Sequence, residues 1–126
     1  MPISVAIDGP ASSGKGTVAR LTARTLDYAY IDTGAMYRAV ALASQRQGIS
    51  WEDGPALGAL TASLTFSFAW DGAKLRVMVD GEDVSGLIRA EAVGQGASRV
   101  SVHPQVRAAL LDQQRSLAAG GGVVME

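Results

Sequence analysis

One short stretch near the N-terminus carries the strongest structural signal in the chain: residues 9–17 run Gly9-Pro10-Ala11-Ser12-Ser13-Gly14-Lys15-Gly16-Thr17. It follows an apolar run, residues 3–7, and then Asp8. A glycine-rich loop can turn several backbone N–H groups toward one anion, because no Cβ blocks the approach. Lys15 adds a cation, and a helix beginning near it directs its positive end to the same point. The stretch therefore predicts a loop that binds the phosphates of a nucleoside triphosphate.

The loop differs at one position from the commonest phosphate-binding pattern. In that pattern a Ser or Thr follows the lysine directly and holds Mg²⁺, whereas here Gly16 intervenes and the hydroxyl comes at Thr17. We therefore expect Thr17 to contact phosphate, and the sequence assigns no metal ligand. A glycine-rich turn without a ligand is the alternative, and the strand-like and helix-like patterns on either side of the loop argue against it.

Composition limits the classes of protein to which the chain can belong. Its 126 residues are 48% apolar and 18% charged, which is typical of one globular domain and not of a disordered chain. A net charge of −1 provides no broad basic surface for a nucleic acid. There are no cysteines for disulfides or zinc, and no apolar stretch approaches the ~18–20 residues of a membrane span. We expect a soluble cytoplasmic protein with no nucleic-acid or membrane partner.

Strand and helix patterns alternate around the loop. Residues 3–7 and 28–31 are short apolar runs typical of buried strands, and residues 15–26 and 36–47 have the spacing of helices. This order predicts an α/β fold with an open parallel sheet flanked by helices. Ligands of such sheets lie at the carboxyl ends of the strands, where residues 9–17 and 32–38 fall.

The middle of the chain has a different pattern. Ser50, followed by Asp53, predicts a capping box that opens a helix ending near residue 63. Asp-Gly turns at residues 71–72 and 80–81 separate alternating apolar runs, which predicts an antiparallel β-meander over about residues 63–88. Residues 90–100 and 104–117 again have helical spacing. We expect the meander to form a small lobe inserted into the α/β core.

These patterns divide the chain into three parts. Residues 1–49 form the predicted core with the phosphate-binding loop, residues 50–103 the insert, and residues 104–126 the return to the core. Residues 123–125 resemble a further buried strand, and the chain ends directly after it at Glu126. A parallel strand normally has neighbours and covering helices on both faces. We therefore expect a truncated chain whose sheet is incomplete.

Three motifs, in the same order, resemble those of one enzyme family. Residues 9–17 resemble the phosphate loop of nucleoside monophosphate kinases, in which Gly-Thr also follows the lysine. Residues 32–38, Asp-Thr-Gly-Ala-Met-Tyr-Arg, resemble the acceptor-side motif of cytidylate kinases, and residues 80–85 with Ile88-Arg89 resemble their inserted lobe. The resemblance implies a P-loop kinase fold, ATP with Mg²⁺ as the phosphoryl donor, CMP and dCMP as acceptors, and a monomeric full-length enzyme.

Two side chains are the predicted catalytic residues. Lys15 serves the donor phosphates. Arg38 lies one helical turn after Gly34, so its guanidinium can reach an acceptor phosphate in a bidentate manner. The expected ATP-phosphate contacts are the residues of the loop: Gly9, Pro10, Ala11, Ser12, Ser13, Gly14, Lys15, Gly16 and Thr17.

Further acceptor contacts are implied by the resemblance. Thr33 corresponds to a contact with the acceptor nucleotide, and Ser98 and Arg107 correspond to positions that recognise the cytosine base. Asp32 can orient the acceptor or Arg38 through a charge-assisted hydrogen bond. Tyr37 is assigned to the acceptor site, with packing as an equal alternative.

Five other conspicuous residues receive no role in the site. Trp51 and Trp70 flank turns and are expected to pack against the meander. His103 is expected to be an isolated imidazole, and Glu82 and Asp83 to be solvated turn residues.

The family pattern also contains elements that this chain does not include. A Gly-Arg-Asp motif follows the strand that residues 123–126 resemble, and an arginine-bearing lid comes later. We therefore expect little or no turnover from these residues alone. Two alternatives stay open: another small P-loop kinase with AMP or shikimate as acceptor, and a nucleotide-binding module without catalysis.

Overall fold

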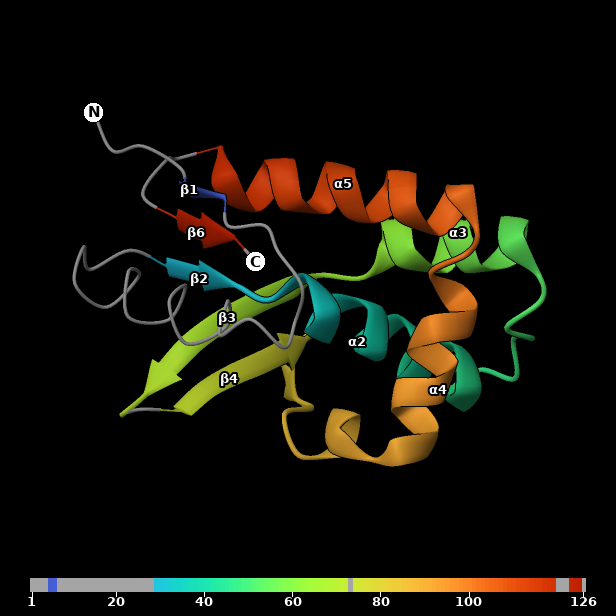
Figure 1. Ribbon diagram of the computed structural model, residues 1–126, viewed down its shortest axis with the longest axis horizontal. Coiled ribbons are helices and arrows are strands. Elements are labelled where there is room, and N and C mark those ends of the chain that lie inside the picture. The colour runs from blue at the N-terminus through green and yellow to red at the C-terminus, as the bar shows by residue number, and fades with distance from the viewer. Residues whose placement is uncertain (1–4, 7–28, 73, 120–122, 126) are drawn as a thin grey trace.

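The computed structural model describes residues 5–6, 29–72, 74–119 and 123–125. Three short strands form a parallel sheet in the order β1-β6-β2: β1 (Val5–Ala6), β6 (Val123–Met125) and β2 (Ala29–Ile31) (Figure 1). Ala6 and Ile31 are both register partners of Met125, so the three strands end at the same edge. The phosphate-binding loop predicted at residues 9–17 and the helix predicted at residues 15–26 lie outside the described residues.

The chain leaves β2 directly into α2 (Thr33–Arg46), which begins three residues before the predicted start at residue 36. The cause is Asp32, whose Oδ1 accepts a hydrogen bond of 3.0 Å from the backbone N–H of Ala35 and so caps the helix. The same device opens α3 (Gly54–Ser63), where the Asp53 side chain accepts from Ala56 N. The predicted capping box, with Ser50 as the N-cap, is therefore wrong. Asp53, the other member of that predicted box, is itself the N-cap of α3.

The predicted β-meander is confirmed. Strands β3 (Phe66–Asp71), β4 (Lys74–Val79) and β5 (Glu82–Asp83) form an antiparallel sheet in the order β3-β4-β5. Asp80 and Gly81 connect β4 to β5 with φ values of 51° and 83°. Positive φ at both central residues is the signature of a type I′ turn, whose twist matches that of the flanking strands.

The chain returns from the meander through η2 (Leu87–Arg89), a 3₁₀ turn, into α4 (Glu91–Val100) and α5 (Pro104–Ala118). Helix α4 packs on α2, and α5 runs alongside α3 (Figure 1). A continuous core joins these elements, and its largest side chains with almost no exposure are Ile31, Met36, Val40, Leu57, Val100, Val106 and Leu110. Burial of these apolar surfaces fixes the first turn of α2 relative to the meander and α4.

Two minor predictions about single residues are wrong. Trp51 lies against Gly96 of α4 and not on the meander. His103 is not isolated, because its Nε2 lies 2.7 Å from the Trp51 carbonyl oxygen, which accepts a hydrogen bond from that nitrogen. Both contacts join segments about fifty residues apart in the sequence, which local patterns do not indicate.

Candidate acceptor site

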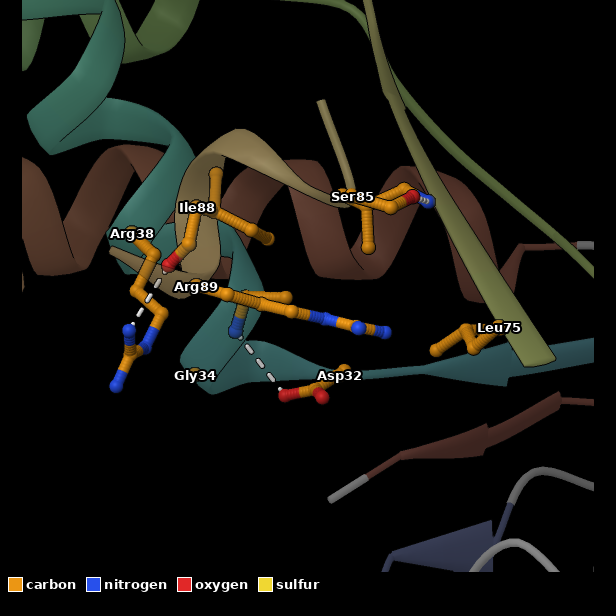
Figure 2. Close-up of a pocket in the computed structure, with 9 residues that line it drawn as sticks. Asp32, Gly34, Arg38, Leu75, Ser85, Ile88 and Arg89 are labelled. Carbon is orange, nitrogen blue, oxygen red and sulfur yellow. Dashed lines mark hydrogen bonds between the residues drawn. The ribbon is translucent and has the colours of Figure 1, made fainter. Parts of the chain in front are cut away.

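A cavity of about 360 Å³ opens at the first turn of α2. Its walls come from the start of α2, from β4, and from the segment that leads through η2 (Figure 2). This volume lies within the roughly 300–1,000 Å³ of typical small-molecule sites. The lining residues are Asp32, Gly34, Ala35, Arg38, Leu75, Val77, Ser85, Ile88 and Arg89.

Asp32 lines this cavity, as its position after β2 predicts. Its Oδ1 accepts from Ala35 N, so part of the carboxylate caps α2. The first turn of a helix presents backbone N–H groups and the positive end of the helix dipole. The site therefore combines a local positive field with one carboxylate, an arrangement that orients a ligand as well as binding it.

Arg38 lies one turn further along α2, where two neighbouring segments hold its guanidinium. Nη1 donates a hydrogen bond of 2.9 Å to the carbonyl oxygen of Ile88 in η2 (Figure 2). Gly94 of α4 approaches so closely that a Cβ there would lie 3.0 Å from Nη2. A guanidinium has five N–H donors, so the bond to Ile88 leaves most of them for a ligand.

The structure adds two lining residues to which the sequence gave no role. Arg89 is exposed, and its side chain extends from η2 across the cavity in the direction of Leu75 on β4 (Figure 2). Ser85 is buried, and its Oγ accepts a hydrogen bond of 2.8 Å from Val77 N. The Ile88-Arg89 pair was visible as part of the third motif, but only the 3₁₀ turn brings Arg89 back to the start of α2.

The other predicted acceptor residues lie outside this lining. Thr33 begins α2 beside Asp32. Ser98 is exposed on α4, one helical turn after Gly94, and its Oγ lies 3.5 Å from the Gly94 carbonyl oxygen. Ser98 is therefore on the face of α4 that covers Arg38.

Tyr37 and Arg107 interact electrostatically across two helices. Burial raises the pKa of the half-buried Tyr37 hydroxyl above its usual value, and the positive charge of Arg107 opposes that rise. Arg107 is exposed in the first turn of α5. The two predicted residues therefore lie within electrostatic range of each other, and neither lines the cavity.

The part of the chain that the structure describes contains no cluster of three His, Cys, Asp or Glu side chains able to hold a metal ion. None of its helices is long and apolar enough to cross a membrane. The polar groups that line the cavity are two guanidinium groups, one carboxylate, a buried hydroxyl and the start of α2.

A site with these groups in an α/β protein is suited to a small anionic molecule, and comparison with known proteins narrows this class. Residues 5–126 match the family model described as cytidylate kinase. The cytidylate kinase of Pelotomaculum thermopropionicum is 51% identical over 124 residues, which are 98% of this chain and 55% of the relative. That of Geobacter sp. (strain M21) is 49% identical over 124 residues, 98% of this chain and 53% of the relative.

A third relative, the cytidylate kinase of Neisseria gonorrhoeae, is 49% identical over 122 residues, 97% of this chain and 54% of the relative. The chain belongs to the cytidylate kinase family. It spans about half the length of the curated relatives that it matches.

Proposed function

We propose that these residues form the acceptor-binding part of an enzyme that transfers the terminal phosphoryl group of ATP to CMP or dCMP, giving CDP or dCDP and ADP. Membership of the cytidylate kinase family supports the reaction class. The structural observation that supports it most is the cavity at the start of α2, because Arg38 lines it with most of its donors still available.

Arg38 is proposed to bind the phosphate of the acceptor. Phosphoryl transfer between two polyanions depends chiefly on holding them in line and reducing their repulsion. Arg38, Arg89 and the N–H groups at the start of α2 supply positive charge for this purpose. No general base is needed, because an acceptor phosphate is already ionised at neutral pH.

The base is proposed to lie further along α4 and α5. Ser98 and Arg107 would contact the amino group and ring atoms of cytosine, Thr33 the nucleotide, and Tyr37 the wall of the site. Two observations support this placement. Ser98 shares a helix face with Gly94, which touches Arg38. The positive charge of Arg107 lowers the pKa of the Tyr37 hydroxyl against the effect of burial.

ATP, the phosphoryl donor, is assigned to the loop at residues 9–17. We propose that this loop, with Lys15, holds the phosphates of ATP. Ala6 and Ile31 share Met125 as register partner, so the chain leaves β1 at the edge from which α2 begins. Mg²⁺ is proposed to accompany ATP.

The cellular location, partners and oligomeric state are proposed from the family. We propose a cytoplasmic enzyme that acts on small molecules as a monomer. The chain is proposed to be organised in three parts, at residues 1–49, 50–103 and 104–126. The net charge of −1 supports small-molecule partners over nucleic acid.

An acceptor panel tests the proposal. Binding of CMP, dCMP, UMP, AMP and shikimate to the chain is measured by calorimetry, and ADP release from Mg·ATP is measured with each acceptor and with water. Binding is included because turnover by these 126 residues alone is proposed to be low. CMP and dCMP are expected to bind. Binding of AMP or shikimate in their place would indicate another small P-loop kinase, and triphosphate binding without any acceptor effect would indicate a module without catalysis.

A further inference from the structure

Trp51 contacts α2, α4 and the residue that caps α5, and these three helices carry proposed acceptor residues. Its Nε1 donates a hydrogen bond of 3.0 Å to the Oγ of Ser44, a fully buried residue of α2. Its ring lies against Gly96 of α4, and its carbonyl oxygen accepts from His103, which directly precedes α5. The residue thus joins α2, α4 and the start of α5 at one point.

The contact with α4 is a slot at Gly96, where the Trp51 ring occupies the space that any side chain at this position would need. A Cβ at Gly96 would lie 2.5 Å from Cζ2 and 2.8 Å from Cη2 of Trp51, distances that real Cβ atoms do not show. Arg99, one turn further along α4, covers the ring with its guanidinium carbon 5.4 Å from the ring centroid and also pairs with Glu52. Because packed interiors deform little, α4 cannot approach α2 here without displacing the indole.

The same helix carries residues that are proposed for the acceptor site. Gly94 touches the guanidinium of Arg38, and Ser98 follows one turn later on the same face. Gly94, Gly96 and Ser98 lie within two turns of one helix, so any shift of α4 at the slot moves all three. Trp51 itself does not line the cavity, so it acts on the site only through its neighbours.

We infer that Trp51 is a positioning residue that sets the spacing between the phosphate-binding end of the acceptor site, at Arg38, and its base-recognising end, at Ser98 and Arg107. The inference rests on the proposed function. The ligand class is a pyrimidine nucleoside monophosphate. Selection between cytosine and uracil depends on this spacing, because hydrogen bonds to a base edge tolerate little displacement.

A pair of complementary substitutions tests the slot. Gly96→Ala places a Cβ inside the ring volume and is expected to weaken CMP binding by about tenfold to a hundredfold and to lower the ratio of CMP to UMP affinity. Trp51→Leu removes the obstructing ring edge. The double variant is therefore expected to recover much of the ratio that Gly96→Ala loses, since residues in contact behave non-additively.

A control separates positioning from general loss of stability. Phe66 is buried at the start of β3. Phe66→Leu is expected to lower the melting temperature without changing the CMP to UMP ratio. An unchanged ratio in Gly96→Ala, or a double variant that merely adds the two single effects, overturns the inference.

Amide hydrogen exchange in α4, measured without ligand, keeps this inference distinct from the proposed function. Faster exchange over residues 91–100 in Gly96→Ala, slowed again in the double variant, supports the positioning role of Trp51. Unchanged exchange overturns it. If the unaltered chain binds no CMP, the proposed function fails, while the exchange result still decides whether Trp51 positions α4.

Discussion

Arg38 and Arg46 lie about two turns apart on α2, and their guanidinium groups have opposite environments. Nη1 and Nη2 of Arg46 donate hydrogen bonds to the two carboxylate oxygens of Glu82, at 2.7 and 3.1 Å. Arg38 donates to the neutral carbonyl of Ile88, and among the described residues no carboxylate forms an ion pair with it. A guanidinium with a bidentate carboxylate has little left to offer a ligand, whereas one held by a carbonyl keeps its charge and most of its donors.

The largest expected effect tests this difference directly. Arg38→Gln is expected to weaken CMP binding by about a hundredfold, because hydrogen bonds to a charged group contribute about 1.5–3 kcal/mol. Calorimetric titration with CMP measures it, and Arg46→Gln is the matched control on the same helix, with CMP affinity unchanged. Equal losses in the two variants would refute the distinction between the two ends of α2.

Arg89→Gln is expected to weaken CMP binding less than Arg38→Gln does, although both arginines line the cavity. Arg89 is exposed and reaches the cavity from a short 3₁₀ turn, so its hydrogen bonds are less pre-organised than those of Arg38. The expected loss of CMP affinity is about tenfold. The decisive measurement is the salt dependence of CMP binding, which becomes shallower when a phosphate-facing cation is removed; an unaltered salt dependence contradicts the assignment.

Arg107→Gln tests the proposed neighbourhood of Tyr37. The positive charge of Arg107 lowers the pKa of the Tyr37 hydroxyl against the larger effect of burial, which raises it. Removing the charge is therefore expected to raise this pKa further. Ultraviolet titration of tyrosinate, with Tyr37→Phe to assign the signal, measures the shift, and an unchanged pKa would show that the two residues are not neighbours.

The smallest effect concerns the Arg46–Glu82 ion pair. The hydrogen bond to Arg46 lowers the pKa of Glu82, so the pair stabilises the fold above the unfolded-state pKa, and this contribution disappears as the pH falls through the folded-state pKa. Both side chains are about half exposed, so the change in melting temperature is expected to be small. Between neutral pH and pH 3, the melting temperature of Glu82→Gln should fall less than that of the unaltered chain, and high salt should reduce this difference between the two proteins. A larger fall in the variant would contradict this expectation.

Much of the fold was predictable because its signals are local. Asp-Gly turns at residues 71–72 and 80–81 predicted the meander, and the periodicity of residues 90–100 and 104–117 predicted α4 and α5 to within a residue. The start of α3 was missed because Ser50 and Asp53 both suit a helix N-terminus, and sequence spacing alone does not say which of them caps it.

The candidate site was predictable only in part. Asp32 and Arg38 were predicted because they belong to one local motif at the end of a strand, where α/β folds bind ligands, and both line the cavity. Arg89 and Ser85 were missed because a cavity wall built from a 3₁₀ turn and a meander leaves no periodic pattern. The contacts of Trp51 were missed for the same reason, since its partners Gly96 and His103 are distant in sequence.

The sequence by itself determined the elements, the motifs of residues 9–17 and 32–38, and membership of the cytidylate kinase family. These depend on local conformational preference and residue identity, which sequence expresses directly. Only the tertiary structure decided which arginine faces a cavity and which is neutralised by a carboxylate. That distinction depends on contacts between distant segments, such as Arg38 with Ile88 and Arg46 with Glu82, and packing of the whole core brings those segments together.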